Sequence, residues 1–242
     1  VVTRRQRQMC IRDRWYSLQK ILRQEWVESS LSDLEQEEPD DLMMHPLRLA
    51  LEVQSLMNQN DWLVIDGGNT HFWSEIAVNM AGAQGKELAG IIHPGSFSML
   101  GVGVSFGLAA KLNHPKDRVV VISGDGAFLS GGLSIEAAFQ ENVPITVVID
   151  NNGGLTTISQ QQERLFADER HVATDFRDIP FHTMFEGMGG HGELVEKPED
   201  LKAALERALS SGKTACVNVR TRSAISPIVL ATTSKRDKAS IE

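Results

Sequence analysis

Short apolar runs alternate with longer amphipathic stretches from residue 45 onward, and turn-forming residues separate them. Gly, Pro, Asn or Asp bounds each apolar run, as expected where strands and helices meet loops. Most of the runs are continuously apolar, which is typical of strands that are covered on both faces. The pattern therefore predicts an α/β fold with a doubly wound, mainly parallel sheet flanked by helices.

The pattern assigns five strands and four helices. The predicted strands are 62–66, 90–93, 118–123, 145–150 and 215–219. The predicted helices are 46–57, 101–112, 132–141 and 198–210. The last helix has the clearest pattern, because Leu201, Ala204 and Leu205 repeat at helical spacing after a Pro-Glu-Asp start that suits a helix N-terminus.

The two ends of the chain differ from this pattern. Residues 1–14 hold five arginines and one aspartate without a helical period, and residues 28–41 form an acidic linker. We expect 1–41 to be an unpacked tail and linker. The string 9–14 resembles translated adaptor sequence, so 1–14 is either an artefact or a real basic tail. Residues 42–222 then form the folded domain, and 223–242 form a tail that folds over a site or stays loose.

Composition and charge narrow the class of protein. The formal net charge of -8 argues against a general nucleic-acid binder, which usually carries a basic patch. The two cysteines, Cys10 and Cys216, form no CxxC pair or zinc cluster, which fits a reducing cytoplasm. The sequence holds neither an apolar run of about 18 residues nor the apolar core of a signal peptide. We expect a cytoplasmic protein without nucleic-acid or membrane partners.

Candidate chemistry lies where two neighbouring strands end. Strand 118–123 runs into Gly124-Asp125-Gly126, and strand 145–150 runs into Asn151-Asn152-Gly153-Gly154. Both loops follow the carboxyl ends of parallel strands, where open sheets bind ligands, often at a switch in strand order. A carboxylate, an amide oxygen and a backbone carbonyl are hard oxygen ligands for Mg²⁺. The glycines allow a diphosphate to approach closely, and the following helix offers free N–H groups.

Each loop alone is an ordinary turn signature. Together, with Asn152 following Asp125 by 27 positions, they resemble the cofactor motif of thiamine diphosphate-dependent enzymes. The resemblance implies that Asp125, Asn152 and the Gly154 carbonyl bind Mg²⁺. It also implies which residues contact the cofactor, and that residues just past the metal loop line the substrate side. The implied cofactor contacts here are Gly124, Asp125, Gly126, Ala127, Asn152, Gly154 and Leu155, and the implied substrate-side residues are Leu155, Thr156 and Thr157.

Two further segments agree with this resemblance. Residues 66–73, Asp-Gly-Gly-Asn-Thr-His-Phe-Trp, resemble the first diphosphate-contact loop of the acetolactate synthase and 2-hydroxyacyl-CoA lyase branch, which implies contacts from Gly68, Asn69 and Thr70.

Residues 94–101 resemble the loop whose bulky apolar side chain wedges between the two cofactor rings and bends the cofactor into a V. The resemblance implies that Leu100 takes the wedge position, that the Ser98 carbonyl accepts a hydrogen bond from the aminopyrimidine, and that Met99 is a further contact. Leu100 and Ser98 are thus the implied catalytic residues. Without the resemblance, Leu100 would be read as a core leucine.

Two other features have competing interpretations. Residues 101–107 resemble a dinucleotide-binding GxGxxG, but Phe106 stands where the third glycine belongs, so we reject a Rossmann nicotinamide site. His71, His93 and His191 are candidate acid–base groups because imidazole titrates near neutral pH, or they are structural or solvated. His93 is the most interesting, since it precedes the wedge loop.

The resemblance, which spans about 46–222, implies a reaction that makes or breaks a carbon–carbon bond next to a carbonyl, with a 2-oxo acid or an acyl-CoA as substrate. An acetolactate synthase-like enzyme is the first interpretation. The alternatives are a 2-hydroxyacyl-CoA lyase or oxalyl-CoA decarboxylase-like enzyme, a non-catalytic cofactor-binding subunit, or an unrelated nucleotide-binding module. The basic run 235–238 either meets CoA phosphates in an acyl-CoA enzyme or, as the preferred interpretation, is an exposed charged tail.

The family also needs a pyrimidine-binding domain, from the same or another chain, whose glutamate contacts the aminopyrimidine. We therefore expect a homodimer or tetramer of the whole enzyme. We also expect these residues to be a fragment that is inactive or nearly so by itself.

Overall fold

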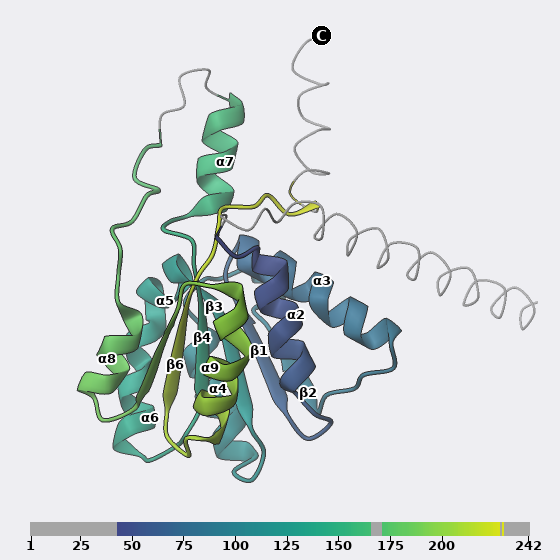
Figure 1. Cartoon of the computed structure of the whole chain (residues 1–242), viewed down its shortest axis with the longest axis vertical. Helices are drawn as coiled ribbons and strands as arrows, with labels where there is room; N and C mark the ends of the chain where they lie inside the picture. The colour runs from purple at the N-terminus through teal and green to yellow at the C-terminus, as the bar shows by residue number, and fades with distance from the viewer. Residues whose placement is uncertain (1–42, 166–170, 228, 230–242) are drawn as a thin grey trace, which may run out of the picture.

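In the computed structural model, residues 43–165, 171–227 and 229 are described, and they form one sheet flanked by helices (Figure 1). All six strands are parallel, in the order β2-β1-β3-β4-β6-β5. The strands are β1 Trp62–Asp66, β2 Gly90–Ile92, β3 Val119–Gly124, β4 Thr146–Asn151, β5 His191–Val195 and β6 Ala215–Arg220. The helices are α2 Pro46–Leu56, α3 Asn69–Ala83, α4 Gly103–Asn113, α5 Asp125–Gly131, α6 Glu136–Gln140, α7 Thr156–Leu165, α8 Phe181–Gly187 and α9 Pro198–Ser210, with short 3-10 turns η1 Gly95–Phe97 and η2 Gly132–Ile135. The predicted fold class is confirmed.

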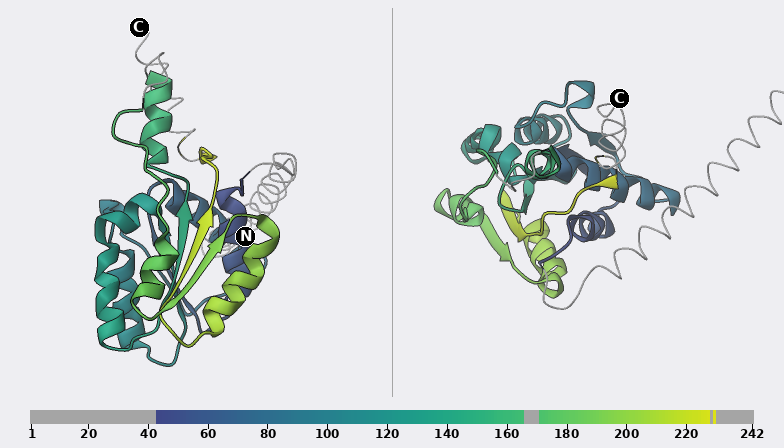
Figure 2. Two further views of the ribbon diagram at one scale, coloured as in Figure 1. Left: turned by 60° about the vertical axis from the view of Figure 1, so that its left-hand side comes forward. Right: turned by 90° about the horizontal axis from the view of Figure 1, so that it is seen from above.

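Successive residues of the inner strands β1, β3, β4 and β6 serve two separate cores, because side chains alternate between the faces of a sheet. Leu63 and Ile65 of β1 belong to the core under α2 and α9, whereas Val64 packs with α4, α5 and α8. The helix α3 lies on the first face and packs against α2. Figures 1 and 2 show this three-layer arrangement, with α7 projecting beyond the sheet. Burial on both faces explains why β3 and β4 are buried along their whole length.

All five predicted strands are present, and no strand end differs from its predicted position by more than one residue. The predicted helices at 46–57 and 198–210 are also confirmed. The helix predicted at 101–112 begins only at Gly103, because Gly101 has a φ of 89° that no helix accommodates. The predicted helix 132–141 is divided into the turn η2 and the short helix α6.

The pattern missed one strand and four helices. β5 lies at the edge of the sheet and is mostly half-exposed, so its His-Gly-Glu-Leu-Val sequence lacks the continuous apolar run of the inner strands. The helices α3 and α5 begin inside segments that were interpreted as loops, and α7 and α8 had no predicted counterpart. The first two omissions matter for function, because both helices start at the candidate site.

The strand order creates a crevice at the carboxyl edge of the sheet. β1 pairs with β2 on one side and with β3 on the other. After β1 the chain therefore adds β2 on one side of it, and then crosses over to add β3 on the opposite side. The connecting helices α3 and α4 accordingly lie on opposite faces. Such a switch in strand order is where open α/β sheets bind ligands. Strand register aligns the two neighbouring loops, since Gly124 of β3 lies opposite Asp150 of β4.

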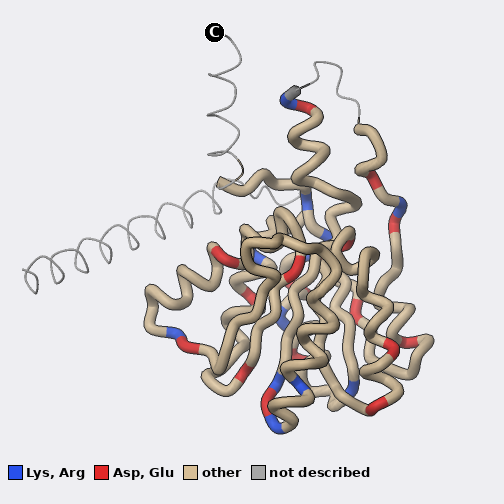
Figure 3. The backbone as a smooth tube through the Cα atoms, turned by 180° about the vertical axis from the view of Figure 1, so that it is seen from behind, with Lys and Arg blue, Asp and Glu red and all other residues tan. Residues whose placement is uncertain are grey.

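Acidic and basic residues are dispersed over the described surface, with red and blue segments interspersed in Figure 3. Within residues 43–165, 171–227 and 229, every helix is too short or too polar to span a bilayer. The predicted tail and linker 1–41, the possible artefact at 1–14 and the basic run 235–238 lie outside the described residues.

Candidate functional site

A cavity of about 300 Å³ opens at the carboxyl ends of β1, β3 and β4. Its wall combines the loops that follow these strands with the start of α7 and part of the wedge loop. The lining residues are Gly67, Gly68, Asn69, Thr70, Phe72, Ser98, Leu100, Gly124, Asp125, Gly126, Ala127, Asn152, Gly154, Leu155, Thr156, Thr157 and Ile158. The structure thus brings together four segments, 67–72, 98–100, 124–127 and 152–158, which 23 to 25 intervening residues separate in the sequence.

Asp125 is the buried acid of this cavity. It is the first residue of α5, directly after β3, and is only 2% exposed. Its Oδ2 accepts hydrogen bonds from the backbone amides of Gly153 (2.8 Å) and Gly154 (3.0 Å), while Oδ1 accepts one from Gly126 (2.6 Å). Burial, together with the nearby charge of Asp150, raises the pKa of Asp125 to about 7, despite the three amide donors. A carboxylate in this environment favours a cation that would compensate its charge.

Asp150 lies behind Asp125 and is completely buried. Its two oxygens accept hydrogen bonds from the hydroxyls of Thr70 (Oδ2, 2.7 Å) and Thr221 (Oδ1). Burial raises the pKa of Asp150, and the two hydroxyl donors oppose that shift. These bonds join Thr70, at the start of α3, to the end of β4 and to Thr221 directly after β6, so Asp150 connects a cavity residue to two inner strands.

Asn152 and Gly154 lie on the β4–α7 loop, beside Asp125. The Asn152 Oδ1 accepts a hydrogen bond from the Thr156 hydroxyl (2.6 Å), and the Gly154 carbonyl accepts one from the Thr156 amide (3.0 Å). Oxygen atoms have more than one lone pair, so both acceptors retain capacity for a cation. The structure therefore places a carboxylate, an amide oxygen and a carbonyl along one cavity wall.

The wedge loop is held from β1. The carboxylate of Asp66, at the end of β1, accepts hydrogen bonds from the amides of Gly101 (3.1 Å) and Gly103 (2.7 Å). Burial raises the pKa of Asp66, although these amides and that of Gly67 oppose the shift. The loop between these anchors and η1 carries Ser98, whose φ of 48° and ψ of 33° are left-handed. Leu100 is 38% exposed and lines the cavity.

A left-handed non-glycine residue is uncommon and costs free energy, so the surrounding structure must impose the backbone at Ser98. Leu100 is not the core leucine that its sequence alone would indicate, because it reaches the cavity. Met99 is 63% exposed and is absent from the cavity lining. Twelve of the thirteen residues that the resemblance implied as cofactor contacts line the cavity, and Met99 is the exception.

Asn69 and Thr70 form the first turn of α3, where backbone N–H groups lack helical partners. Both line the cavity, but their side chains are engaged elsewhere. The carboxamide of Asn69 donates to the Ala224 carbonyl (2.6 Å) and accepts from the Ser226 amide (3.2 Å). The indole of Trp73 donates to the same carbonyl (3.0 Å). The chain beyond β6 thus crosses the start of α3, and a ligand would meet backbone amides there more than the Asn69 side chain.

Phe72 and Ile158 add apolar surface to the cavity, and sequence reasoning did not single out either. Ile158 lies on α7 and is 45% exposed, and Phe72 lies on α3. The sequence offered one signal for Phe72, which is its position within 66–73, the segment that resembles the family's first diphosphate-contact loop. The three candidate acid–base histidines, His71, His93 and His191, do not line the cavity.

An open parallel sheet with a buried acid and glycine loops at its switch point is the arrangement at which α/β domains of cofactor enzymes bind their ligands. The chain belongs to such a family: residues 66–219 match the model described as the thiamine pyrophosphate enzyme, C-terminal TPP binding domain. Thiamine pyrophosphate is the same compound as thiamine diphosphate.

Named relatives come from both branches that the sequence indicated. The chain is 34% identical over 199 residues to a probable acetolactate synthase of Mycobacterium bovis, covering 81% of this chain and 35% of that protein. It is 28% identical over 166 residues to a catabolic acetolactate synthase of Raoultella terrigena (69% and 28%). It is 31% identical over 138 residues to a 2-hydroxyacyl-CoA lyase of Oryza sativa subsp. japonica (53% and 23%). The chain therefore spans about a third or less of the length of the curated relatives it matches.

Proposed function

We propose that this chain supplies the diphosphate- and Mg²⁺-binding half of the active site in an acetolactate synthase-like enzyme. The reaction class is decarboxylation of a 2-oxo acid and carboligation, in which a carbon–carbon bond next to a carbonyl is broken or made. One observation carries the proposal: the buried Asp125 carboxylate meets the Asn152–Gly154 loop inside a glycine-walled cavity at the switch point of the sheet. The names of the relatives support the reaction class.

The residues present fit Mg²⁺. Asp125 is a buried acid without a basic partner among the groups that shift its pKa, and Asn152 and Gly154 add neutral oxygens. Three hard oxygen ligands are what Mg²⁺ takes from a protein when phosphate oxygens and water complete its octahedron. Asp125, Asn152 and the Gly154 carbonyl would hold the ion, and Gly68, Gly124, Gly126 and Ala127 would receive the diphosphate.

Glycine is needed where the backbone must approach a ligand or a neighbouring loop closely. A Cβ on Gly126 would lie 2.5 Å from Leu155, and a Cβ on Gly124 would lie 2.9 Å from the Thr70 hydroxyl oxygen. Larger residues at either position would therefore push apart the loops that form the cavity. The first turn of α5, from Asp125, would present to the anion those N–H groups that lack a helical partner, apart from the Gly126 amide, which donates to the Asp125 carboxylate.

Bound thiamine diphosphate supplies the reactive thiazolium carbon and the electron sink. This chain's residues would set its conformation. Leu100 presents an apolar side chain to the cavity from a loop that Asp66 anchors, which suits the wedge between the cofactor rings. The Ser98 carbonyl would orient the aminopyrimidine. Leu155, Thr156 and Thr157, at the start of α7, would face the substrate.

We further propose that the pyrimidine-binding half lies outside these residues, in the same chain or another. Leu100 and Ile158 would then meet a second domain, and the whole enzyme would be a cytoplasmic homodimer or tetramer. By themselves these 242 residues would be inactive or nearly so, because the other half would contribute the glutamate that activates the aminopyrimidine. Decarboxylation or carboligation by the purified chain would contradict this.

The test is calorimetric titration of the full chain with thiamine diphosphate. We expect weak binding that requires Mg²⁺ and that Asp125→Ala abolishes. Asp200→Ala removes an exposed carboxylate on α9, far from the cavity, and should bind like the parent. Binding of ATP in place of thiamine diphosphate would sink the proposal and favour an unrelated nucleotide-binding module.

A 2-hydroxyacyl-CoA lyase or oxalyl-CoA decarboxylase-like enzyme is the second candidate, supported by the rice relative. The substrate would then be an acyl-CoA in place of a 2-oxo acid. Product analysis of the chain joined to its pyrimidine-binding half separates the two, since only one of them cleaves a 2-hydroxyacyl-CoA. If that complex binds cofactor and turns over neither substrate, the chain is a non-catalytic cofactor-binding subunit.

A further inference from the structure

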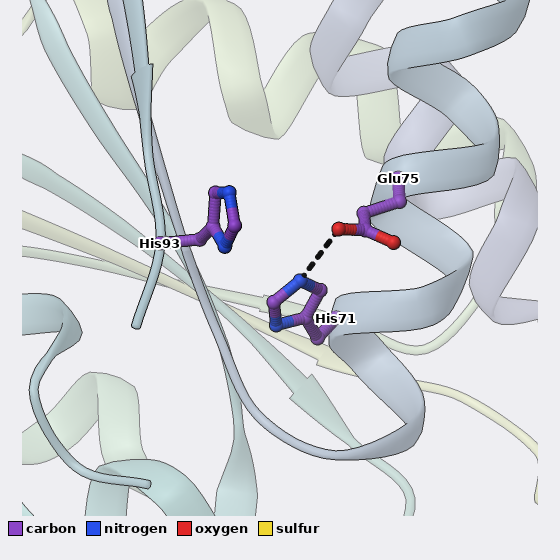
Figure 4. A group of neighbouring side chains, drawn as sticks. All are labelled: His71, Glu75 and His93. Atoms are coloured by element: carbon purple, nitrogen blue, oxygen red, sulfur yellow. Dashed lines mark hydrogen bonds and ion pairs between the residues drawn. The ribbon is translucent and has the colours of Figure 1, made fainter. Parts of the chain in front are cut away.

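Three metal-ligating side chains converge beside α3, outside the cofactor cavity. His71 and Glu75 lie one turn apart on α3, and His93 follows β2 (Figure 4). One ligand atom from each residue lies within 4.8 Å of the other two. Within the described part of the chain, no other group of three His, Cys, Asp or Glu side chains comes as close together.

The donor set is one that transition metals bind. The Nε2 of His71 and the Oε1 of Glu75 are 2.9 Å apart, and the rings of His71 and His93 meet edge to face with centroids 5.2 Å apart. Two imidazoles and a carboxylate are the protein ligands of many zinc sites. Around tetrahedral Zn²⁺, with bonds of about 2.0–2.1 Å, the ligand atoms lie about 3.4 Å apart. Small side-chain movements would close the observed arrangement onto an ion.

Charge and access also favour a cation. Glu75 forms an ion pair with His71, and the side chains of His71 and Glu75 are 13% and 39% exposed, so an ion can enter from solvent. Glu193 also pairs with a histidine, but Arg207 holds both of its oxygens at 2.7–2.8 Å.

Another histidine has two acidic partners and still lacks this geometry. His171 contacts Glu163 through Nε2 and Asp175 through Nδ1. The two carboxylates therefore lie on opposite sides of the ring and cannot share one ion with it. His171 and His191 thus provide matched controls within the same chain.

We propose that His71, Glu75 and His93 bind a divalent transition-metal ion, with Zn²⁺ as the expected species, at a site separate from the Mg²⁺ site of Asp125. The ion takes the place of the proton that His71 and Glu75 share, because metal ligands must be deprotonated. Imidazole ligands favour Zn²⁺, whereas carboxylate and carbonyl oxygens suit Mg²⁺. The two sites therefore select different ions.

If His93 binds a metal ion, its ring loses one hydrogen bond that it accepts in this structure. The Gly95 amide donates to the Nδ1 of His93 (3.1 Å), which leaves the proton of the neutral ring on Nε2. Binding through either ring nitrogen releases this amide, and Gly95 is exposed enough for water to replace the bond. A fourth ligand would be water.

The site connects two segments of the cofactor cavity. His71 lies between Thr70 and Phe72, which line the cavity, and His93 begins the stretch that leads to Ser98 and Leu100. An ion held by both histidines would brace the wedge loop against α3. Its role is structural, since none of its three ligands reaches the cavity lining.

The test is titration of the chelator-treated full chain with Zn²⁺ in the presence of excess Mg²⁺, followed by calorimetry. We expect one Zn²⁺ site that His71→Ala and His93→Ala each weaken by more than about tenfold, as loss of a ligand should cost at least as much as loss of an outer-shell partner. His191→Ala and His171→Ala should leave the affinity unchanged. Co²⁺ should give the intense visible absorption of a four-coordinate complex in the parent and lose it in His93→Ala.

As a control for correct folding, the unfolding midpoints of the parent and of each variant are compared in the absence of metal. Glu75→Gln retains the size of the side chain and removes its charge, so it serves if an alanine variant is unstable. The proposal is overturned if Zn²⁺ binds these three variants as tightly as it binds the parent, or if the parent binds no Zn²⁺.

Discussion

The carboxylate of Asp66, at the end of β1, lies 2.7 Å from the backbone nitrogen of Gly103, at the start of α4, and accepts its hydrogen bond. The same carboxylate accepts the Gly101 amide at 3.1 Å. Both amides lie just past Leu100, so a single buried side chain fixes the residues that end the wedge loop. The relationship makes Asp66 a positioning residue for a loop, 94–101, that begins 28 positions later in the chain.

Replacing Asp66 should therefore loosen the wedge loop. In Asp66→Ala the two amides lose their acceptor, and we expect their hydrogen exchange to accelerate and stability to fall by about 1–3 kcal/mol. Asp66→Asn keeps one acceptor oxygen and should give an intermediate effect. Native-state hydrogen exchange at Gly101 and Gly103 measures this directly, and unchanged protection in Asp66→Ala would show that the loop is held by other contacts.

The buried Asp150 gives a second prediction. Thr70→Val removes the hydroxyl that donates to Oδ2 of Asp150 and leaves a buried carboxylate with one hydroxyl partner. The free energy of unfolding should fall by about 1–3 kcal/mol. Thr183→Val removes an exposed hydroxyl bonded to the Pro180 carbonyl and should change little. Urea titration of both variants tests the difference, and equal losses would argue against a special role for Thr70.

Stability in the absence of metal should depend on pH through Asp125. Its pKa in the folded chain, about 7, is higher than the ordinary value of 3.8, so the folded chain holds the proton more tightly than the unfolded chain. The stability from this proton is fully present below about pH 4 and is lost as the pH rises to about 7.

Asp125→Asn should remove this dependence. Between pH 4 and 7 the unfolding free energy of Asp125→Asn should rise relative to the parent by about 1.4 kcal/mol per pH unit. Chemical denaturation with a chelator present, repeated at several pH values, gives the slope. Asp200→Asn should run parallel to the parent, and a parallel Asp125→Asn would mean that Asp125 has an ordinary pKa.

Two glycines at helix ends should respond differently to the same substitution. A Cβ on Gly131 would lie 2.0 Å from the Gly101 carbonyl oxygen, a backbone atom that cannot move without shifting the wedge loop. A Cβ on Gly187 would meet nothing within 4 Å. We expect Gly131→Ala to lower the thermal midpoint and to weaken cofactor binding, and Gly187→Ala to leave both nearly unchanged. A Gly131→Ala variant as stable as Gly187→Ala would refute the close approach of α5 to the wedge loop.

The sequence by itself determined the parallel sheet and most of the loops that line the cavity. Continuous apolar runs predicted β3 and β4, because inner strands are buried on both faces. Local glycine and asparagine chemistry marked the loops after them, and the family resemblance assigned Asp125, Asn152 and Gly154 to one function. These features depend on residues that are close together in the chain.

Only the tertiary structure decided which distant groups meet. The switch in strand order brings Asp66 to the amides of 101–103, and the path of the chain beyond β6 brings Ala224 to Asn69 and Trp73. The His71–Glu75–His93 cluster likewise requires β2 to lie beside α3. Periodicity reports the local environment of each residue and carries no information about strand order, so these partners on different elements became visible only when the sheet was assembled.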